Sequence, residues 1–191
     1  MLPTIKHQEA NKYVVCAKLL TGYRKIKAKV DDPDSYIKAN SIFDADFVTY
    51  MVSWKNNHKL TADGIIGPST WRAIAKAAPT CSTSKNKTSG YTMALQILLD
   101  TNITCDAIYG KRTKQAVATY EDSNGLTSDG IADAKVGSGI KNLIMWKTLR
   151  ELSGMLEQYR NTADPALPAL MLGAAEELRV STYRYFKALE R

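Results

Sequence analysis

The stretch LTADGIIGPSTWRAI, residues 60–74, decides the fold. Asp63 can support a turn through its side chain, and Gly64 accepts the positive φ angle that such a turn needs. Proline is favoured in a first helical turn, so Pro68 predicts a helix start, with Thr70 placed to bond back to the loop. Three apolar residues are expected to hold the stretch on a core: Ile65, Trp71 and Ile74.

A similar stretch follows 66 residues later, since Asp129 minus Asp63 is 66. Read in full, SIFDADFVTYMVSWKNNHKLTADGI (residues 41–65) lies over AIYGKRTKQAVATYEDSNGLTSDGI (residues 107–131). Upstream, CAKLLTGY resembles LQILLDTN at an offset of 79, since Leu98 minus Leu19 is 79. The first unit therefore holds about 13 extra residues around KVDDPDSYIKAN, which we interpret as a surface loop. The chain thus contains an internal repeat.

Each unit is predicted to form three helices. In the first unit the apolar spacing and turn residues predict helices over Glu9–Tyr23, Asp44–Asn56 and Pro68–Ala78. In the second unit they predict Tyr91–Asp100, Lys111–Ser123 and about Asn142–Tyr159, the last after a Gly-rich insertion of about nine residues. We expect an all-α fold with a first repeat over 1–79, a linker over 80–90, a second repeat over 91–160 and a C-terminal amphipathic helix within 161–191.

The two units resemble the peptidoglycan-binding type-1 module, a three-helix repeat with the pattern DGxxGxxTxxAVxxFQxxxGLxxDGxxGxxTWxAL. Residues 60–74 match its second half, and IYGKRTKQAVATYEDSNGLTSDGI, residues 108–131, matches its first half. The resemblance covers roughly Glu9–Leu149. In the C-terminal segment, DPALPALMLGAAEELRVSTYRYFKALER is similar to the closing helix of a wall-binding module found behind phage-type lysozyme-like hydrolases. The alternative interpretation of this segment is a structural helix that packs against the repeats or against a partner protein.

The chain departs from the pattern at several positions. Trp54–Lys55 and Tyr120–Glu121 replace Phe-Gln, and Asp44 replaces a glycine. The resemblance implies a groove between the Asp-Gly loop and the second helix of a unit, where polar groups hold stem-peptide amides or N-acetyl groups and an aromatic ring stacks on sugar. The exposed ligand-binding candidates in the first unit are Tyr50, Asn57, Asp63 and Arg72.

Charge and composition limit the partners. The formal net charge is +7, which favours an acidic partner such as an anionic wall polymer, anionic lipid or nucleic acid. No apolar run reaches the length of a membrane span, and the first residues lack the apolar core of a secretory signal. We expect an envelope, periplasmic or extracellular location without a recognisable signal peptide, or a cytoplasmic one before release if the protein is phage-encoded.

No catalytic constellation emerges from the sequence. The two histidines, His7 and His58, are too few for a zinc hydrolase, and His58 is interpreted as an exposed loop residue. The glutamates weighed for glycosidase chemistry are interpreted as surface charges: Glu9, Glu121 and Glu176. Of the three cysteines, Cys16 is expected to be buried, and a disulfide between Cys81 and Cys105 is left open. We expect no metal, no cofactor and no enzymatic activity.

Two alternatives to wall binding stay open. The chain could be an adaptor or structural protein of a phage or secretion machine that docks on another protein. It could also be a basic helical protein that binds nucleic acid, with Lys111, Arg112 and Lys114 at the start of a helix. Aromatic residues are not interleaved with these cations, which disfavours nucleic acid. The leading hypothesis is non-catalytic binding of peptidoglycan, through its glycan strand or its stem peptide, to target the protein itself or an attached or associated wall hydrolase or phage lysin.

Overall fold

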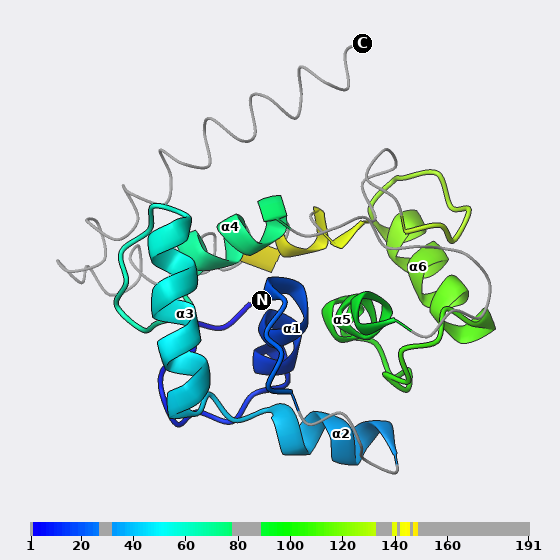
Figure 1. Cartoon of the computed structure of the whole chain (residues 1–191). Coiled ribbons are helices and arrows are strands. Elements are labelled where there is room, and N and C mark those ends of the chain that lie inside the picture. Colours follow the sequence, from blue (N-terminus) through cyan, green and yellow to red (C-terminus); the bar gives the residue numbers. More distant parts are fainter. Residues whose placement is uncertain are drawn as a thin grey trace, which may run out of the picture. The chain divides into compact units, whose positions relative to one another are not determined.

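The computed structural model describes residues 2–26, 32–77, 89–132, 139–140, 142–145 and 147–148. Over these residues the fold is all-α, as the sequence predicts (Figure 1). Two isolated antiparallel bridges, Ile5–Ile66 and Ala10–Ile42, tie the N-terminal segment to the loops beside it. Residues 140, 142–145 and 147–148 are helical, so this helix begins at Ile140, two residues before the predicted start at about Asn142. The named helices are α1 (Lys12–Thr21), α2 (Pro33–Asn40), α3 (Ala45–Asn57), α4 (Pro68–Ala77), α5 (Gly90–Leu99) and α6 (Lys111–Ser123).

The helix boundaries follow local capping chemistry. The Asp44 side chain accepts the Phe47 backbone N–H at 2.8 Å, so α3 begins one residue after the predicted position. The predicted bounds of α6 are confirmed. The first helix begins at Lys12 rather than at Glu9, because the Asn11 side chain accepts the Tyr13 N–H at 2.9 Å and so caps the helix there.

The interpretation of residues 29–40 as a surface loop is wrong, because α2 occupies most of this segment. The Asp32 side chain accepts the Ser35 N–H at 2.8 Å, Pro33 is the first helical residue, and Asp34 lies in the first turn. These are helix-start signals that outweigh the lack of an apolar period. Only Asn40 of the helix is buried, so the segment is a surface helix that contacts α1.

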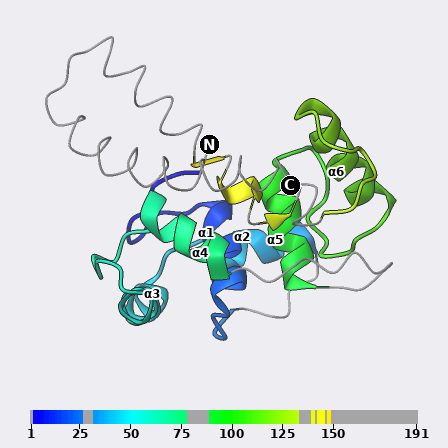
Figure 2. The ribbon, with the colours of Figure 1, turned by 90° about the horizontal axis from the view of Figure 1, so that it is seen from above.

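The centre of the fold is a pair of apolar helices. In α1 every residue from Tyr13 to Lys18 is buried, and in α5 every residue from Thr92 to Leu99 is buried. A helix that is apolar on all sides belongs in a core. α1 packs against α5 along its length, and it also contacts α2 and α4 (Figures 1 and 2). The expected burial of Cys16 is confirmed, and its thiol lies against the carbonyl of Ala94.

Around this pair, the first repeat adds a cluster of large side chains from α3, α4 and the loops beside them. The expected burial of Trp71 and Ile74 is confirmed, whereas Ile66 rather than Ile65 is the buried isoleucine of the Asp-Gly stretch. The Trp71 indole N–H donates to the Pro3 carbonyl at 3.0 Å, which anchors the N-terminal segment. The fully buried side chains of this cluster are Ile5, Phe43, Phe47, Met51, Ile66, Trp71 and Ile74.

All six named helices belong to one compact unit, Pro3–Met145. It contains the helices of both predicted repeats up to Met145. The sequence boundary at 80–90 therefore does not separate two compact bodies, and the division into repeats stays a prediction about sequence units. The predicted C-terminal helix and most of the inserted loop before Trp146 lie outside the described residues.

Candidate functional site

Four turns lie at equivalent positions of the predicted repeat: Asn40–Ile42, Asp63–Ile65, Asp106–Ile108 and Asp129–Ile131. We number them in chain order and name them the Asp-x-Ile turns after the last three, which share one geometry, whereas the first has asparagine and a φ of −75° at Ser41. In the last three, the aspartate Oδ1 accepts the N–H of the isoleucine two residues on, at 3.0, 2.9 and 2.8 Å. Their middle residues have φ angles of +68°, +64° and +67°. Glycine suits this conformation, and Ala107 adopts it where the wall-binding pattern has glycine.

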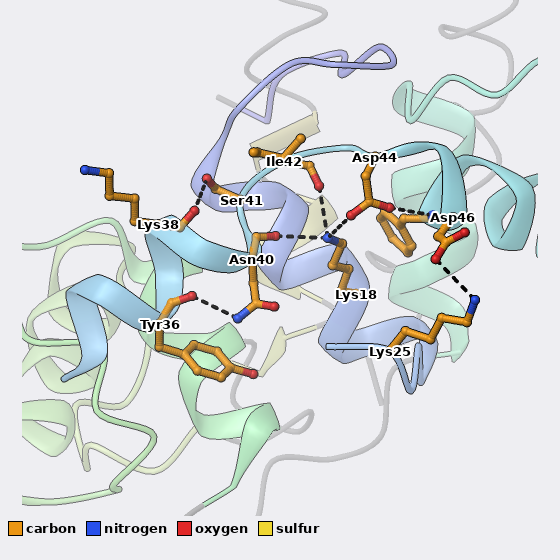
Figure 3. Close-up of polar contacts among 10 residues, drawn as sticks. Lys18, Lys25, Tyr36, Lys38, Asn40, Ser41, Ile42, Asp44 and Asp46 are labelled. Atoms are coloured by element: carbon orange, nitrogen blue, oxygen red, sulfur yellow. Dashed lines mark hydrogen bonds and ion pairs between the residues drawn. The ribbon is translucent and has the colours of Figure 1, made fainter. Parts of the chain in front are cut away.

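A buried polar side chain from a helix holds each turn. In the first turn, the Lys18 ammonium donates to the carbonyls of Asn40 at 3.2 Å and Ile42 at 2.9 Å, and it pairs with the Asp44 carboxylate at 3.4 Å (Figure 3). Lys18 is 3 % exposed and lies 5.2 Å from the centre of the Phe47 ring. A buried ammonium requires several acceptors, and this loop supplies them.

The second and third turns are held in the same way. The Lys55 ammonium donates to the Asp63 carboxylate and, at 2.8 Å, to the Ile65 carbonyl. The Gln96 amide donates to Asp106 Oδ1 at 2.8 Å and to the Ile108 carbonyl at 3.2 Å. Lys55 and Gln96 therefore donate to equivalent acceptors in two different turns, namely one aspartate carboxylate oxygen and one isoleucine carbonyl oxygen.

The interpretation of Glu121 as a surface charge is wrong. This residue is fully buried, and its Oε2 accepts the Gly130 N–H of the fourth turn at 2.8 Å. Its Oε1 is buried without a hydrogen-bond partner among the described residues. Glu121 occupies the position equivalent to Lys55 in the aligned repeats, and its carboxylate likewise bonds the turn rather than facing solvent.

The turns also correct the register of the repeat. Lys18 bonds the Ile42 carbonyl and Gln96 bonds the Ile108 carbonyl, so Lys18 corresponds to Gln96. Gln96 minus Lys18 is 78, and the same offset relates the first residues of α1 and α5, Lys12 and Gly90. The upstream offset is therefore 78 rather than 79. The alignment by side-chain similarity was wrong by one residue.

The four predicted ligand contacts have different environments. Tyr50 is half-buried: its hydroxyl donates to the Thr21 carbonyl, and its ring lies 5.1 Å from that of Tyr23. The expectation that Tyr50 is exposed is therefore wrong, because this hydrogen bond and ring contact hold it against the end of α1. Asn57 is exposed, as expected, in the last turn of α3.

Asp63 is exposed, as expected, but its carboxylate accepts hydrogen bonds from Lys55 and from the Ile65 N–H of the turn. Burial raises the pKa of Asp63, yet the hydrogen bonds from Lys55 and from the Ile65 N–H, with the Lys55 charge, outweigh it and lower the pKa below its ordinary value. The ion pair spans the space between the Asp-Gly loop and the second helix, where the groove was expected. The loop also lies close to α3 at Gly64, where an added Cβ would lie 3.4 Å from a Val48 methyl.

A surface hollow in the predicted first repeat lies further along the chain, beside α4. It has a volume of about 300 Å³, and we call it the α4 hollow. Of the four predicted contacts, only Arg72 lines it, and the expectation that Arg72 is exposed is wrong, since this residue of α4 is half-buried. The other principal lining residues come from the end of α3, the loop after it and one face of α4: His58, Leu60, Ser69, Ala73 and Lys76.

A second hollow of about 320 Å³, the α6 hollow, lies where the third Asp-x-Ile turn meets the start of α6. Its lining includes Asp106, Ile108, Lys111 and Arg112. Both hollows thus carry a lysine, an arginine, a hydroxyl group and a branched apolar side chain. The basic helix start was visible in the sequence, whereas the hollow beside it depends on the turn and could not be seen there.

Several residues of this region were missed by the sequence interpretation. Lys18, Lys55 and Gln96 look like ordinary polar helix positions, although the alignment of Lys55 with a pattern glutamine was a usable signal. His58 is exposed, as expected. Cys105 carries a free thiol, and Cys81, its partner in the disulfide that was left open, lies outside the described residues. Over the described ranges, no three His, Cys, Asp or Glu side chains are grouped so that they could hold a metal ion.

Comparison with protein families places a match on the second repeat. The family described as "Putative peptidoglycan binding domain" matches residues 91–136, which include α5, α6 and the third and fourth Asp-x-Ile turns. No curated protein and no solved structure matches the chain. In the part of the chain that is described, no helix has the length and apolar character to cross a membrane.

Proposed function

We propose that this chain binds bacterial peptidoglycan without cleaving it, through both repeats, and so targets itself or an attached or associated wall hydrolase or phage lysin. The family match over residues 91–136 carries the proposal, since that family is a peptidoglycan-binding one. The first repeat is included because its helices and turns repeat the hydrogen bonds of the second. For example, the Leu60 N–H donates to the Lys55 carbonyl at 3.0 Å, and the Leu126 N–H donates to the Glu121 carbonyl at 2.9 Å.

The hollows, rather than the predicted groove, are the ligand sites in this proposal. Tyr50 holds the end of α1 and Asp63 holds the second turn, whereas each hollow has an arginine in its lining, Arg72 in the α4 hollow and Arg112 in the α6 hollow. The forked guanidinium group suits the oxygens of carboxylates and amides. Positive charge in both hollows and a net charge of +7 favour approach to an anionic wall.

Co-sedimentation with purified insoluble peptidoglycan tests the proposal. The wild type should be retained at raised salt, Arg72→Gln and Arg112→Gln should each reduce retention, and the double variant should reduce it further. Arg24→Gln is the matched control, because Arg24 is exposed and lines neither hollow. Turbidity of the same suspensions should not fall.

Three results would contradict the proposal. Absence of retention would reject wall binding. Salt-sensitive binding of DNA in its place would favour the nucleic-acid alternative, since phosphate contacts weaken steeply as salt rises. Clearing of the suspension would reveal an enzymatic activity and reject the non-catalytic part.

A further inference from the structure

The fourth Asp-x-Ile turn differs from the other three in the charge of the side chain that holds it. Each of the first three turns receives a hydrogen-bond donor from a helix: the ammonium group of Lys18, the ammonium group of Lys55 or the amide group of Gln96. The fourth turn receives the carboxylate of Glu121 instead, at the position equivalent to Lys55. A negative charge therefore stands where the second turn has a positive one.

Two carboxylates bind neighbouring backbone groups of this turn. Glu121 Oε2 accepts the N–H of Gly130 at 2.8 Å. Asp129 Oδ1 accepts the N–H of the next residue, Ile131, also at 2.8 Å. Because these two N–H groups follow one another on the backbone, both carboxylates lie at the same turn, where their like charges repel. A positive charge close to both would stabilise their ionised forms.

The Glu121 carboxylate also lacks part of its hydrogen bonding. Glu121 is fully buried, and its Oε1 has no hydrogen-bond partner in the part of the chain that the structure describes. A buried carboxylate without a full set of partners is costly. The Lys114 side chain passes beside the turn, since a Cβ added at Gly130 would lie 3.1 Å from Lys114 Cε. Among the described ion pairs, however, none joins Lys114 to either carboxylate.

The second turn shows where a positive charge fits. There the buried Lys55 ammonium donates to the Asp63 carboxylate and to the Ile65 carbonyl. The carboxylate oxygens of glutamate are one bond nearer to Cα than the ammonium nitrogen of lysine. Glu121 therefore ends short of the equivalent point beside Asp129. The place of the ammonium in the second turn corresponds, in the fourth, to a place between two carboxylates.

We infer that the fourth turn binds a divalent cation, Ca²⁺ in preference to Mg²⁺, between the carboxylates of Glu121 and Asp129. Ca²⁺ takes carboxylate and water oxygens in flexible geometry. Asp129 is exposed, so water supplies the ligands that the two side chains do not. Two carboxylates make a weak site, with a Kd of about 1 mM, as in extracellular calcium modules. The ion takes the part that Lys55 has in the second turn, and its binding is independent of peptidoglycan binding in the hollows.

Titration of the full ¹⁵N-labelled chain with CaCl₂ at constant ionic strength tests the inference by NMR. The amide signals of Gly130 and Ile131 should shift and saturate with a Kd of about 1 mM. The amides of Ile65 and Ile108 are matched internal controls, because each donates to the aspartate of a turn that already has a donor from a helix. Their signals should stay in place. MgCl₂ should bind more weakly, since Mg²⁺ demands nearly ideal octahedral geometry.

Urea unfolding of the same chain measures the effect of the ion on stability. In about 10 mM CaCl₂ the unfolding equilibrium constant of the wild type should fall about tenfold, as a Kd of about 1 mM requires. Glu121→Gln and Asp129→Asn each remove one carboxylate charge and should lose this response. Glu121→Lys supplies the ammonium of the second turn and should not respond either. Asp122→Asn, at an exposed position of α6, is the charge-matched control and should respond like the wild type.

Several results would overturn the inference. These are no shift at Gly130 and Ile131, equal shifts at all the turns, or a calcium response that persists in both Glu121→Gln and Asp129→Asn. Loss of the response in Asp122→Asn would assign it to net charge. Lys114→Gln should respond to calcium as the wild type does. A large loss of stability in Lys114→Gln, with no calcium response in the wild type, would show that Lys114 neutralises the carboxylates instead.

Discussion

Buried polar side chains hold the loops of this protein in place. At each of these positions an apolar side chain would have a smaller desolvation cost on folding. Lys18, Lys55 and Gln96 are each 3 % exposed or less, and each donates to a carbonyl oxygen of an Asp-x-Ile turn. Buried carbonyl groups need donors, and loops have few of their own. A long side chain from a rigid helix supplies the donor and sets the position of the turn against the core.

The ion pair between Lys55 and Asp63 makes the free energy of unfolding depend on pH in the acidic range. Because the folded state lowers the pKa of Asp63, its stabilising contribution is present above the unfolded value near 3.8 and is lost as pH falls through the folded value. We expect the free energy of unfolding of the wild type to fall between about pH 5 and pH 2. Asp63→Asn should lack part of this fall, as measured by urea unfolding at several pH values.

Asp122→Asn is the charge-matched control, because Asp122 is exposed near the end of α6 and is remote in sequence from Lys55. If its unfolding free energy changes with pH as that of Asp63→Asn does, the effect belongs to net charge rather than to the turn.

At the scale of elements, the turns decide how closely loop and helix approach. The fourth turn lies directly on α6: a Cβ added at Gly130 would lie 2.7 Å from the Lys114 carbonyl oxygen, and the backbone there has φ +67°. The Tyr109 hydroxyl donates to the Gly130 carbonyl at 3.0 Å and accepts the Ala132 N–H at 3.0 Å, so the turn is tied from a second side.

We expect Gly130→Ala to lower the free energy of unfolding by about 2–4 kcal/mol, because left-handed strain and a clash with backbone act together. Gly125 offers a matched comparison, since it has the same φ of +67° but nothing within 4 Å of an added Cβ. Gly125→Ala should cost only about 1 kcal/mol. Urea unfolding of the two variants measures the difference, and equal losses would show that the close approach to α6 carries no energy.

At the scale of the whole compact unit, the two predicted repeats share a core. α1 of the first repeat and α5 of the second are each buried along most of their length, and they pack on one another. Either repeat alone would expose one of these helices to water. Residues Pro3–Met145 should therefore unfold together.

Val117 tests this coupling, because it is fully buried in α6 of the second repeat, while Trp54 and Trp71 report on the first. Val117→Ala removes two buried methyl groups and should cost about 2 kcal/mol. In a Trp146→Phe background, the fluorescence midpoint of the remaining tryptophans should fall by the same amount as the midpoint followed by circular dichroism. Separate midpoints for the two signals would show independent repeats.

Local chemistry in the sequence determined the helices, the two Asp-Gly turns and the burial of Trp71, Ile74 and Cys16. Those features follow from capping residues, positive φ at glycine and apolar spacing, all of which act over a few neighbouring residues. The sequence Asp32–Pro33 also indicates a helix start for α2. The polar composition of the segment nevertheless led to its interpretation as a loop.

Tertiary structure decided the rest. The burial of Lys18, Lys55 and Glu121 and the role of Tyr50 at the end of α1 depend on partners 8 to 29 residues away in sequence. The α4 hollow also depends on packing, since its lining comes from the end of α3, the loop after it and α4. A polar helix residue looks the same in sequence whether it faces solvent or a loop. Only packing of the loop onto the helix separates the two cases, because burial without a partner would destabilise the fold.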